Sequence, residues 1–255
     1  MRKNIAIVAS MVALTGVLSL TGCGESAAPQ GSAGAPASTS ANAKSPVLSQ
    51  GKGKIAPDDL GDKATEDVEK TVASFEAQYE ELVAQVNSFD AYKANVDAVQ
   101  AYYDTVLQDT KNLCIRMRQY AADCANYVLS TNRTPGQMYD DLEVIYDDLY
   151  DGAGDDLYDA VYDDLFGNLY DAFYDGVVSD GYDLIGYGEW SELSSAAYEM
   201  HSDAHSDAYE LISDCRSDIY EFSSDVRGDV FSDKLDKAKK ELAKFQEDID
   251  ELKAE

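Results

Sequence analysis

The chain has 255 residues, 45% of them hydrophobic, with 49 acidic and 20 basic side chains and a formal net charge of −29 at pH 7. This acidic excess argues against nucleic-acid binding, which needs Lys and Arg to replace the phosphate counterions. It also argues against a chain that lies flat on an anionic membrane. The length fits one soluble domain or one elongated helical body.

The first residues predict export. Arg2 and Lys3 precede an almost uncharged apolar run over residues 5–18, which is short for a membrane span. The tetrapeptide Leu-Thr-Gly-Cys that ends at Cys23 resembles the lipobox of bacterial lipoproteins. The resemblance implies a signal peptide over 1–22, a covalent diacylglycerol on Cys23, and a lipid-anchored protein on the outer face of the cytoplasmic membrane or the cell surface.

Residues 23–59 are predicted to form a flexible tether that starts at the lipidated cysteine. Gly, Ser, Ala and Pro dominate this segment, and it has almost no bulky side chains. Such a composition cannot bury enough apolar surface to offset the entropy of ordering.

The remainder, 60–255, is predicted to be all-α, an elongated antiparallel helical hairpin or coiled-coil bundle of three to four long helices. Apolar residues recur at alternating spacings of three and four, which keeps them on one face of a helix. The expected helices cover 62–87, 90–131, 137–185 and 190–253. The pattern leaves open whether 62–131 is one helix or a hairpin, but Asn87 and Ser88 favour a turn because both are good N-cap residues.

Two internal repeats occupy the second half of the body. A 12-residue repeat over 145–180 carries Tyr-Asp pairs, and an 11-residue repeat over 190–233 carries Ser-Asp pairs. A period of 11 makes three turns of a nearly straight helix. The Tyr and apolar residues of the 12-residue repeat recur every four residues, and on an α-helix each such step rotates the side chain by about 40° around the axis. The row of Tyr and apolar residues in the 12-residue repeat must therefore wind around the helix axis, or the helix must break at its glycines. A turn between the two repeats is expected at 186–189.

These Tyr-Asp and Ser-Asp repeats resemble those of uncharacterised helical lipoproteins of Gram-positive bacteria. The resemblance spans about 62–250 and implies an anchored cell-envelope protein without a defined ligand. The partner would be an unknown protein or envelope component, with no nucleic acid.

Two groups of side chains are candidate cation ligands. Residues 134–200 contain no Lys, Arg or His, and carboxylates recur there at Asp147, Asp151, Asp155, Asp159 and Asp163. Oxygen ligands suit Ca²⁺ and Mg²⁺, so this ladder is either a solvated face or a weak cation site. His201 and His205 stand one turn apart and are either ordinary variable positions of the repeat or ligands for Zn²⁺ or Cu²⁺.

Cysteine and tyrosine leave further alternatives open. Cys114 and Cys124 lie about 15 Å apart on one helix, too far to bridge. A disulfide between Cys124 and Cys215 is conceivable outside the cytoplasm. The alternative is that Cys114, Cys124 and Cys215 are all buried thiols. The Tyr residues between Tyr139 and Tyr220 either pack in the core or present a surface for stacking.

Two function classes follow from the sequence. The first is a lipid-anchored interaction or structural protein, and the second is an extracytoplasmic protein that binds cations or a small ligand. An enzyme is not expected, because the sequence has no Gly-rich phosphate loop and no nucleophile motif. No cofactor is expected beyond the diacylglycerol and weakly bound divalent cations.

Overall fold

The computed structural model describes residues 57–254, and every element within them is a helix, so the predicted all-α bundle is confirmed. The signal peptide, Cys23 and residues 24–56 of the tether lie outside the described residues. The body begins slightly earlier than the predicted residue 60. The long helices are α1 (Pro57–Gln85), α3 (Val96–Leu129), α8 (Tyr187–Phe231) and α9 (Leu235–Leu252), with short helices α2 (Phe89–Ala94) and α4 (Pro135–Asp141).

Residues 135–185 form a fifth long rod, called here the acidic rod. It begins with α4 and continues through alternating π- and α-helical segments. These are η1 (Ile145–Ala153), α5 (Gly154–Leu157), η2 (Tyr158–Leu165), α6 (Phe166–Leu169), η3 (Tyr170–Val178), the 3₁₀ turn η4 (Ser179–Gly181) and α7 (Tyr182–Ile185).

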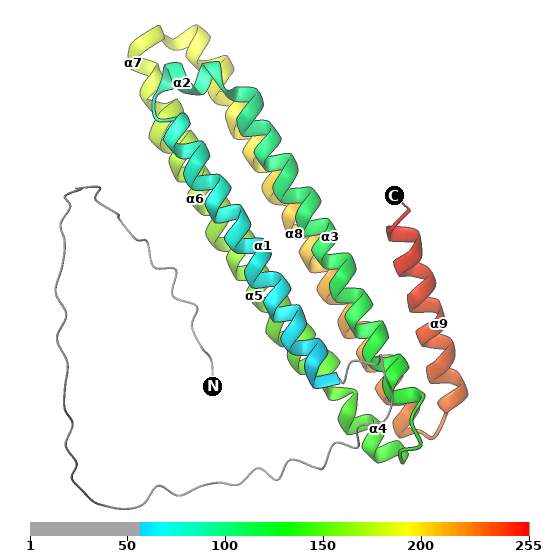
Figure 1. Ribbon diagram of the computed structural model, residues 1–255. Coiled ribbons are helices and arrows are strands. Elements are labelled where there is room, and N and C mark those ends of the chain that lie inside the picture. The colour runs from blue at the N-terminus through cyan, green and yellow to red at the C-terminus, as the bar shows by residue number, and fades with distance from the viewer. Residues whose placement is uncertain (1–56, 255) are drawn as a thin grey trace, which may run out of the picture. The chain divides into compact units, whose positions relative to one another are not determined.

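Two antiparallel hairpins lie side by side in this bundle (Figure 1). The first hairpin pairs α1 with α3, where the Tyr102 hydroxyl donates a hydrogen bond of 2.9 Å to the carbonyl of Phe75. The second pairs the acidic rod with α8. Across the hairpins, α1 packs along the rod and α3 packs along α8. One continuous apolar core fills the space between these four long segments.

Local signals in the sequence set the turns. The Ser88 hydroxyl accepts a hydrogen bond from the Ala91 amide and caps α2, which confirms the predicted turn after α1. Thr134 and Gln137 form a capping box at the start of α4, and Pro135 occupies its first turn. Gly186, with φ of +80°, makes the turn between α7 and α8. The predicted hairpin turn is thus confirmed, although the chain turns within a single residue.

The acidic rod keeps apolar residues spaced by four on one face, although the sequence pattern indicated only winding of the row or breaks in the helix. Its helix neither winds its apolar row around the axis nor breaks at its glycines. Instead π-helical segments with i→i+5 hydrogen bonds recur once per 12-residue repeat, as at the amides of Gly154 and Phe166, which donate to Leu149 and Val161. A row spaced by four stays on one face when each turn takes about four residues, and the π segments supply the extra residues.

The apolar row of the rod accordingly stays buried along its whole length. It comprises Ile145, Leu149, Ala153, Leu157, Val161, Leu165, Leu169, Phe173 and Val177.

The predicted helix over 190–253 is wrong in one respect, because it is two helices. Asp233 takes φ of +57°, and the Lys234 amide donates to the carbonyl of Asp229. The left-handed residue reverses the chain, so α9 folds back onto α3 and α8. Phe245 of α9 stacks on Phe222 of α8 with ring centroids 4.1 Å apart and an interplanar angle of 8°.

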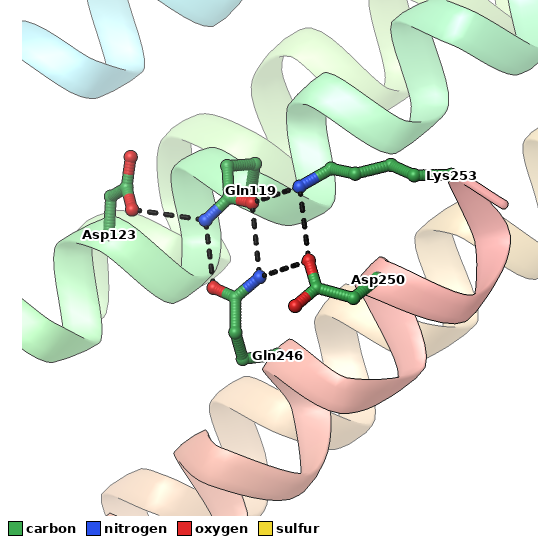
Figure 2. A network of polar contacts seen from close by, with 5 residues as sticks. All are labelled: Gln119, Asp123, Gln246, Asp250 and Lys253. Atoms are coloured by element: carbon green, nitrogen blue, oxygen red, sulfur yellow. Dashed lines mark hydrogen bonds and ion pairs between the residues drawn. The ribbon is translucent and has the colours of Figure 1, made fainter.

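A polar network fixes the other face of α9 against α3 (Figure 2). The amides of Gln119 and Gln246 exchange hydrogen bonds of 2.9 and 3.2 Å. The Lys253 ammonium donates to the Gln119 side-chain oxygen at 2.8 Å and to Asp250 at 3.3 Å. Gln119 also donates to Asp123. No helix among residues 57–254 is both long and apolar enough to cross a membrane.

Candidate functional site

The two repeats meet in register along the seam between the acidic rod and α8. A repeat of 12 residues on the π-expanded rod and a repeat of 11 residues on α8 each complete about three turns. Each Tyr pair on the rod therefore meets one Tyr from α8. The different lengths of the two repeats compensate for the different winding of the two helices.

Three aromatic triads and one pair result, and together they are called the aromatic ladder. The triads are Tyr146, Tyr150 and Tyr220; Tyr158, Tyr162 and Tyr209; and Tyr170, Tyr174 and Tyr198, and Tyr139 pairs with Phe231. Neighbouring ring centroids lie 5.0 to 6.2 Å apart, within the range of favourable aromatic contacts.

The ladder is open to solvent on its α8 side. Tyr198, Tyr209 and Tyr220 are 52%, 48% and 47% exposed, and Phe231 is 75% exposed. The Tyr residues of the rod are half-buried beneath them. The apolar rows of α8 at Ala208, Ile219 and their repeat equivalents face the core instead. Both readings of the Tyr array therefore hold in part, since the rings cover the core and also form a surface.

One column of α8, with a period of 11, places a side chain between the rungs of the ladder. The Arg216 guanidinium lies 5.0 Å from the centroid of Tyr150 and 5.7 Å from that of Tyr158, and it forms an ion pair with Asp155. Gly154 lies against it, and a Cβ there would lie 2.9 Å from the Leu149 carbonyl oxygen and 3.2 Å from the Arg216 side chain. A cation between two aromatic faces and a carboxylate gains from both.

The same column repeats this arrangement in altered form. Arg227 lies 4.4 Å from the centroid of Tyr139 and 2.9 Å from the Glu143 carboxylate. His205 stacks on Tyr162 with centroids 4.1 Å apart. In the remaining repeat the position is Ser194, whose hydroxyl donates to the Tyr174 hydroxyl at 3.3 Å.

A shallow groove of about 610 Å³ opens beside this last rung. It is lined by Tyr174, Ser194, Ser195, Tyr198, Glu199, Ser202 and Asp203. The groove thus combines two aromatic rings with two carboxylates where the column carries the small Ser194 instead of an arginine.

The predicted acidic ladder lies on the rod next to the aromatic rings. Asp147, Asp151, Asp159 and Asp163 are exposed, and Asp155 is half-buried in its ion pair with Arg216. Partial burial, reinforced by the negative charge of Glu143, raises the pKa of Asp147. Arg216 and Arg227 of α8 each pair with one carboxylate of the rod, so α8 neutralises the rod in part.

The two histidines lie in the aromatic layer. The His201 ring is buried, and its Nδ1 forms a hydrogen bond of 3.0 Å with the Tyr103 hydroxyl of α3. Burial, aided by the nearby His205, lowers the pKa of His201 to about 4. The centroids of the two rings are 5.6 Å apart. Among the described residues, no group of three or more His, Cys, Asp or Glu is placed to hold a metal ion.

The sequence left open a Cys124–Cys215 disulfide or three buried thiols, and the structure has three buried thiols. Cys215 lies against Cys114 of α3, with its thiol donating to the Cys114 carbonyl at 3.4 Å, rather than against Cys124.

Sequence reasoning assigned no role to the column of the 11-residue repeat that contains Arg216 and Arg227. The recurrence of both arginines in an otherwise acidic helix was the available signal. Comparison with known proteins adds no relative: no family model, no curated protein and no solved structure matches this chain.

Proposed function

We propose that this chain is a lipid-anchored, non-enzymatic interaction protein on the outer face of the bacterial cytoplasmic membrane, with the aromatic ladder as its binding surface. The lipobox-like tetrapeptide at Cys23 supports the location. The ladder supports the binding role, because a row of half-exposed rings along one helix is a large apolar feature for a chain with net charge −29.

The proposed occupant is a cationic polypeptide segment, rich in Arg or Lys, from a protein of the cell envelope. The observation that carries this choice is Arg216, held between two Tyr rings and Asp155. It shows within the molecule how the ladder binds a guanidinium group. The groove next to Ser194 offers the same combination of rings and carboxylates without an arginine of the chain's own.

Charge also favours a cationic partner. Exposed carboxylates of the rod flank the ladder at Asp151, Asp159 and Asp163, and exposed carboxylates of α8, Glu199 and Asp203, line the groove beside Tyr198. A basic segment would be steered to this surface by long-range attraction. Cation–π contacts with the rings would then add specificity beyond charge.

The test measures binding of an oligo-arginine peptide to the purified chain by fluorescence anisotropy. The variant Tyr198→Ala/Tyr209→Ala/Tyr220→Ala keeps the net charge and removes the exposed rings. Three exposed cation–π contacts of about 0.5–1 kcal/mol each predict a loss of affinity of roughly tenfold to a hundredfold.

The matched control is Leu184→Ala/Tyr187→Ala, which removes exposed hydrophobic residues at the tip of the second hairpin. It should bind the peptide as the unchanged chain does. Equal affinity of the ladder variant and the unchanged chain would show that charge alone attracts the peptide, and would refute the ladder as the binding surface.

The second candidate function is an extracytoplasmic protein that binds divalent cations. The exposed carboxylates of the rod, from Asp147 to Asp163, favour it. It differs from the first in its response to Ca²⁺, because a cation site would raise the melting temperature at micromolar Ca²⁺ in physiological salt.

A further inference from the structure

Two buried thiols face one another across the contact between the hairpins. Cys114 of α3 and Cys215 of α8 are each 1% exposed. The Cys215 thiol donates to the Cys114 carbonyl at 3.4 Å, and each of the two thiols shifts the pKa of the other. The Cys215 sulfur thus contacts the backbone of Cys114, and the two helices belong to different hairpins.

A buried cation accompanies the pair. Arg118, one turn along α3 from Cys114, has a side chain that is 8% exposed and lies 2.7 Å from the Asp218 carboxylate. The interaction with Cys114, together with the charge of Arg118, lowers the pKa of Cys215, and the interaction with Cys215, together with burial, raises the pKa of Cys114. One sulfur of the pair is therefore the better thiolate, as in a dithiol prepared for exchange.

We propose that Cys114 and Cys215 close into an interhelical disulfide when the chain folds in an oxidising compartment. The oxidant is an external disulfide, either a small molecule or a thiol oxidase. The Cys215 thiolate attacks one sulfur of that disulfide and expels the other as a thiolate, which gives a mixed disulfide. The Cys114 thiolate then attacks the Cys215 sulfur and expels the second thiolate. Cys114 and Cys215 together lose two electrons and two protons, and the external disulfide is reduced to two thiols.

The bond would add a covalent link between elements that are held together by packing, the Arg118–Asp218 ion pair and the Tyr103–His201 hydrogen bond. Cys114 and Cys215 are 101 residues apart, and α3 and α8 lie side by side without a direct connection. Closing so long a loop restricts the unfolded chain strongly. Because both sulfurs are buried in the bundle, exchange takes place while the hairpins are still assembling or are transiently separated. The pairing depends on geometry only, whereas the oxidising compartment rests on the proposed extracytoplasmic location.

The experiment refolds the full chain carrying Cys23→Ser in a glutathione redox buffer. Remaining thiols are alkylated in denaturant and counted by intact mass, and the cross-linked peptides are mapped. We expect one alkylated thiol, at Cys124, and a cross-linked peptide that joins Cys114 to Cys215. The oxidised chain should melt on the order of 10 °C above the reduced chain.

Two single variants give matched controls on the same helix. Cys124→Ser should still form the cross-link and still gain thermal stability on oxidation, because residue 124 lies about 15 Å along α3 from Cys114. Cys114→Ser should lose both responses while keeping the helical circular dichroism spectrum. Three alkylated thiols after refolding with oxidant, or a cross-link through Cys124, would overturn the proposal.

The thiol count on protein taken from the membrane fraction tests the compartment separately. A pair that closes in the redox buffer but is reduced in cells would contradict the proposed location and leave the geometric pairing supported.

Discussion

His201 shows how one buried side chain links the two hairpins to solution pH. Its ring lies under the aromatic ladder and contacts the Tyr103 hydroxyl of the opposite hairpin. Burial keeps the imidazole neutral, so its pKa falls from 6.5 to about 4. A group whose pKa is lowered on folding binds its proton more readily in the unfolded chain, and its protonation therefore favours unfolding.

The variant His201→Gln keeps a hydrogen-bonding group near Tyr103 but has no side chain that titrates in this pH range. The stability supplied by neutral His201 is complete above pH 6.5 and is lost as pH falls toward 4. Between about pH 7.5 and about pH 5 this loss should reach roughly 2 kcal/mol in the unchanged chain. The variant should lack it, as measured by urea denaturation at both pH values.

His205→Gln is the control for this pH dependence. It removes the smaller cause of the lowered pKa of His201 and leaves the burial in place, so most of the acid-induced loss should remain. Raised carboxylate pKa values on the rod, as at Asp156, work in the opposite direction and stabilise the fold on acidification. They are common to all three proteins and cancel in the comparison. Parallel stability curves for the unchanged chain and His201→Gln would contradict the prediction.

At the scale of single elements, the acidic rod depends on its extra residues. An α-helix with the same buried row would need spacings of three and four, and the rod has spacings of four throughout. Each π segment therefore behaves as an inserted residue in a helix that would otherwise be α. The insertion keeps the rod in register with the 11-residue repeat of α8.

If the π segments are inserted residues, the rod should tolerate deletion of one residue and α8 should not. Deletion of the exposed Asp163, within η2, leaves Val161 and Leu165 three positions apart, a spacing that still places both on the core face of an α-helix. We expect a change in unfolding free energy within about 1 kcal/mol, since one π turn converts to α. Thermal melting and circular dichroism would measure it.

Deletion of the exposed Asp214 in α8 is the matched control. It rotates every following residue by about 100° and turns the core residues Ile219 and Val226 away from the bundle. That variant should lose cooperative unfolding altogether. Equal damage from the two deletions would show that the π segments are not inserted residues.

Sequence patterns predicted the elements wherever the signal was local. Ser88, Thr134 and Gly186 act on their own backbone, so the turns they mark could be read directly. The break before α9 could not, because the apolar seam continues across it and Asp233 is only one of many aspartates. The π segments depended on a partner helix of a different period, and nothing within the rod alone decides between winding, breaking and expansion.

The candidate site was predictable to a similar extent. The Tyr repeat and its period were evident, but the placement of Arg216 between two rings required the register of two helices that are distant in sequence. The contact of Cys215 with Cys114 could not be predicted for the same reason. Inward-facing positions on two helices do not determine which of them meet until the axial offset between the helices is known.

At the scale of the whole molecule, the dominant quantity is the charge of −29. Arg216 and Arg227 pair with only two carboxylates of the rod, and most of the remaining carboxylates of that face are exposed. Lys residues gather in α9, which packs on α3 and α8 rather than on the rod. The repulsion within the second hairpin must therefore be screened by solution ions, and at physiological salt the Debye length of about 8 Å screens much of it.

We therefore predict that the melting temperature of the body falls markedly at low ionic strength and that plain NaCl restores it. Ca²⁺ at matched ionic strength should add little, because exposed carboxylates on one rigid helix face do not surround an ion as the six to eight oxygen ligands of a calcium site do. Differential scanning fluorimetry with NaCl, CaCl₂ and EDTA series measures both effects. A melting temperature that rises sharply with micromolar Ca²⁺ in physiological salt would favour the cation-binding function over the interaction function. The ion would then be expected on the Asp147–Asp163 face, because its carboxylates lie at successive turns of the rod and a bound cation would reduce their mutual repulsion.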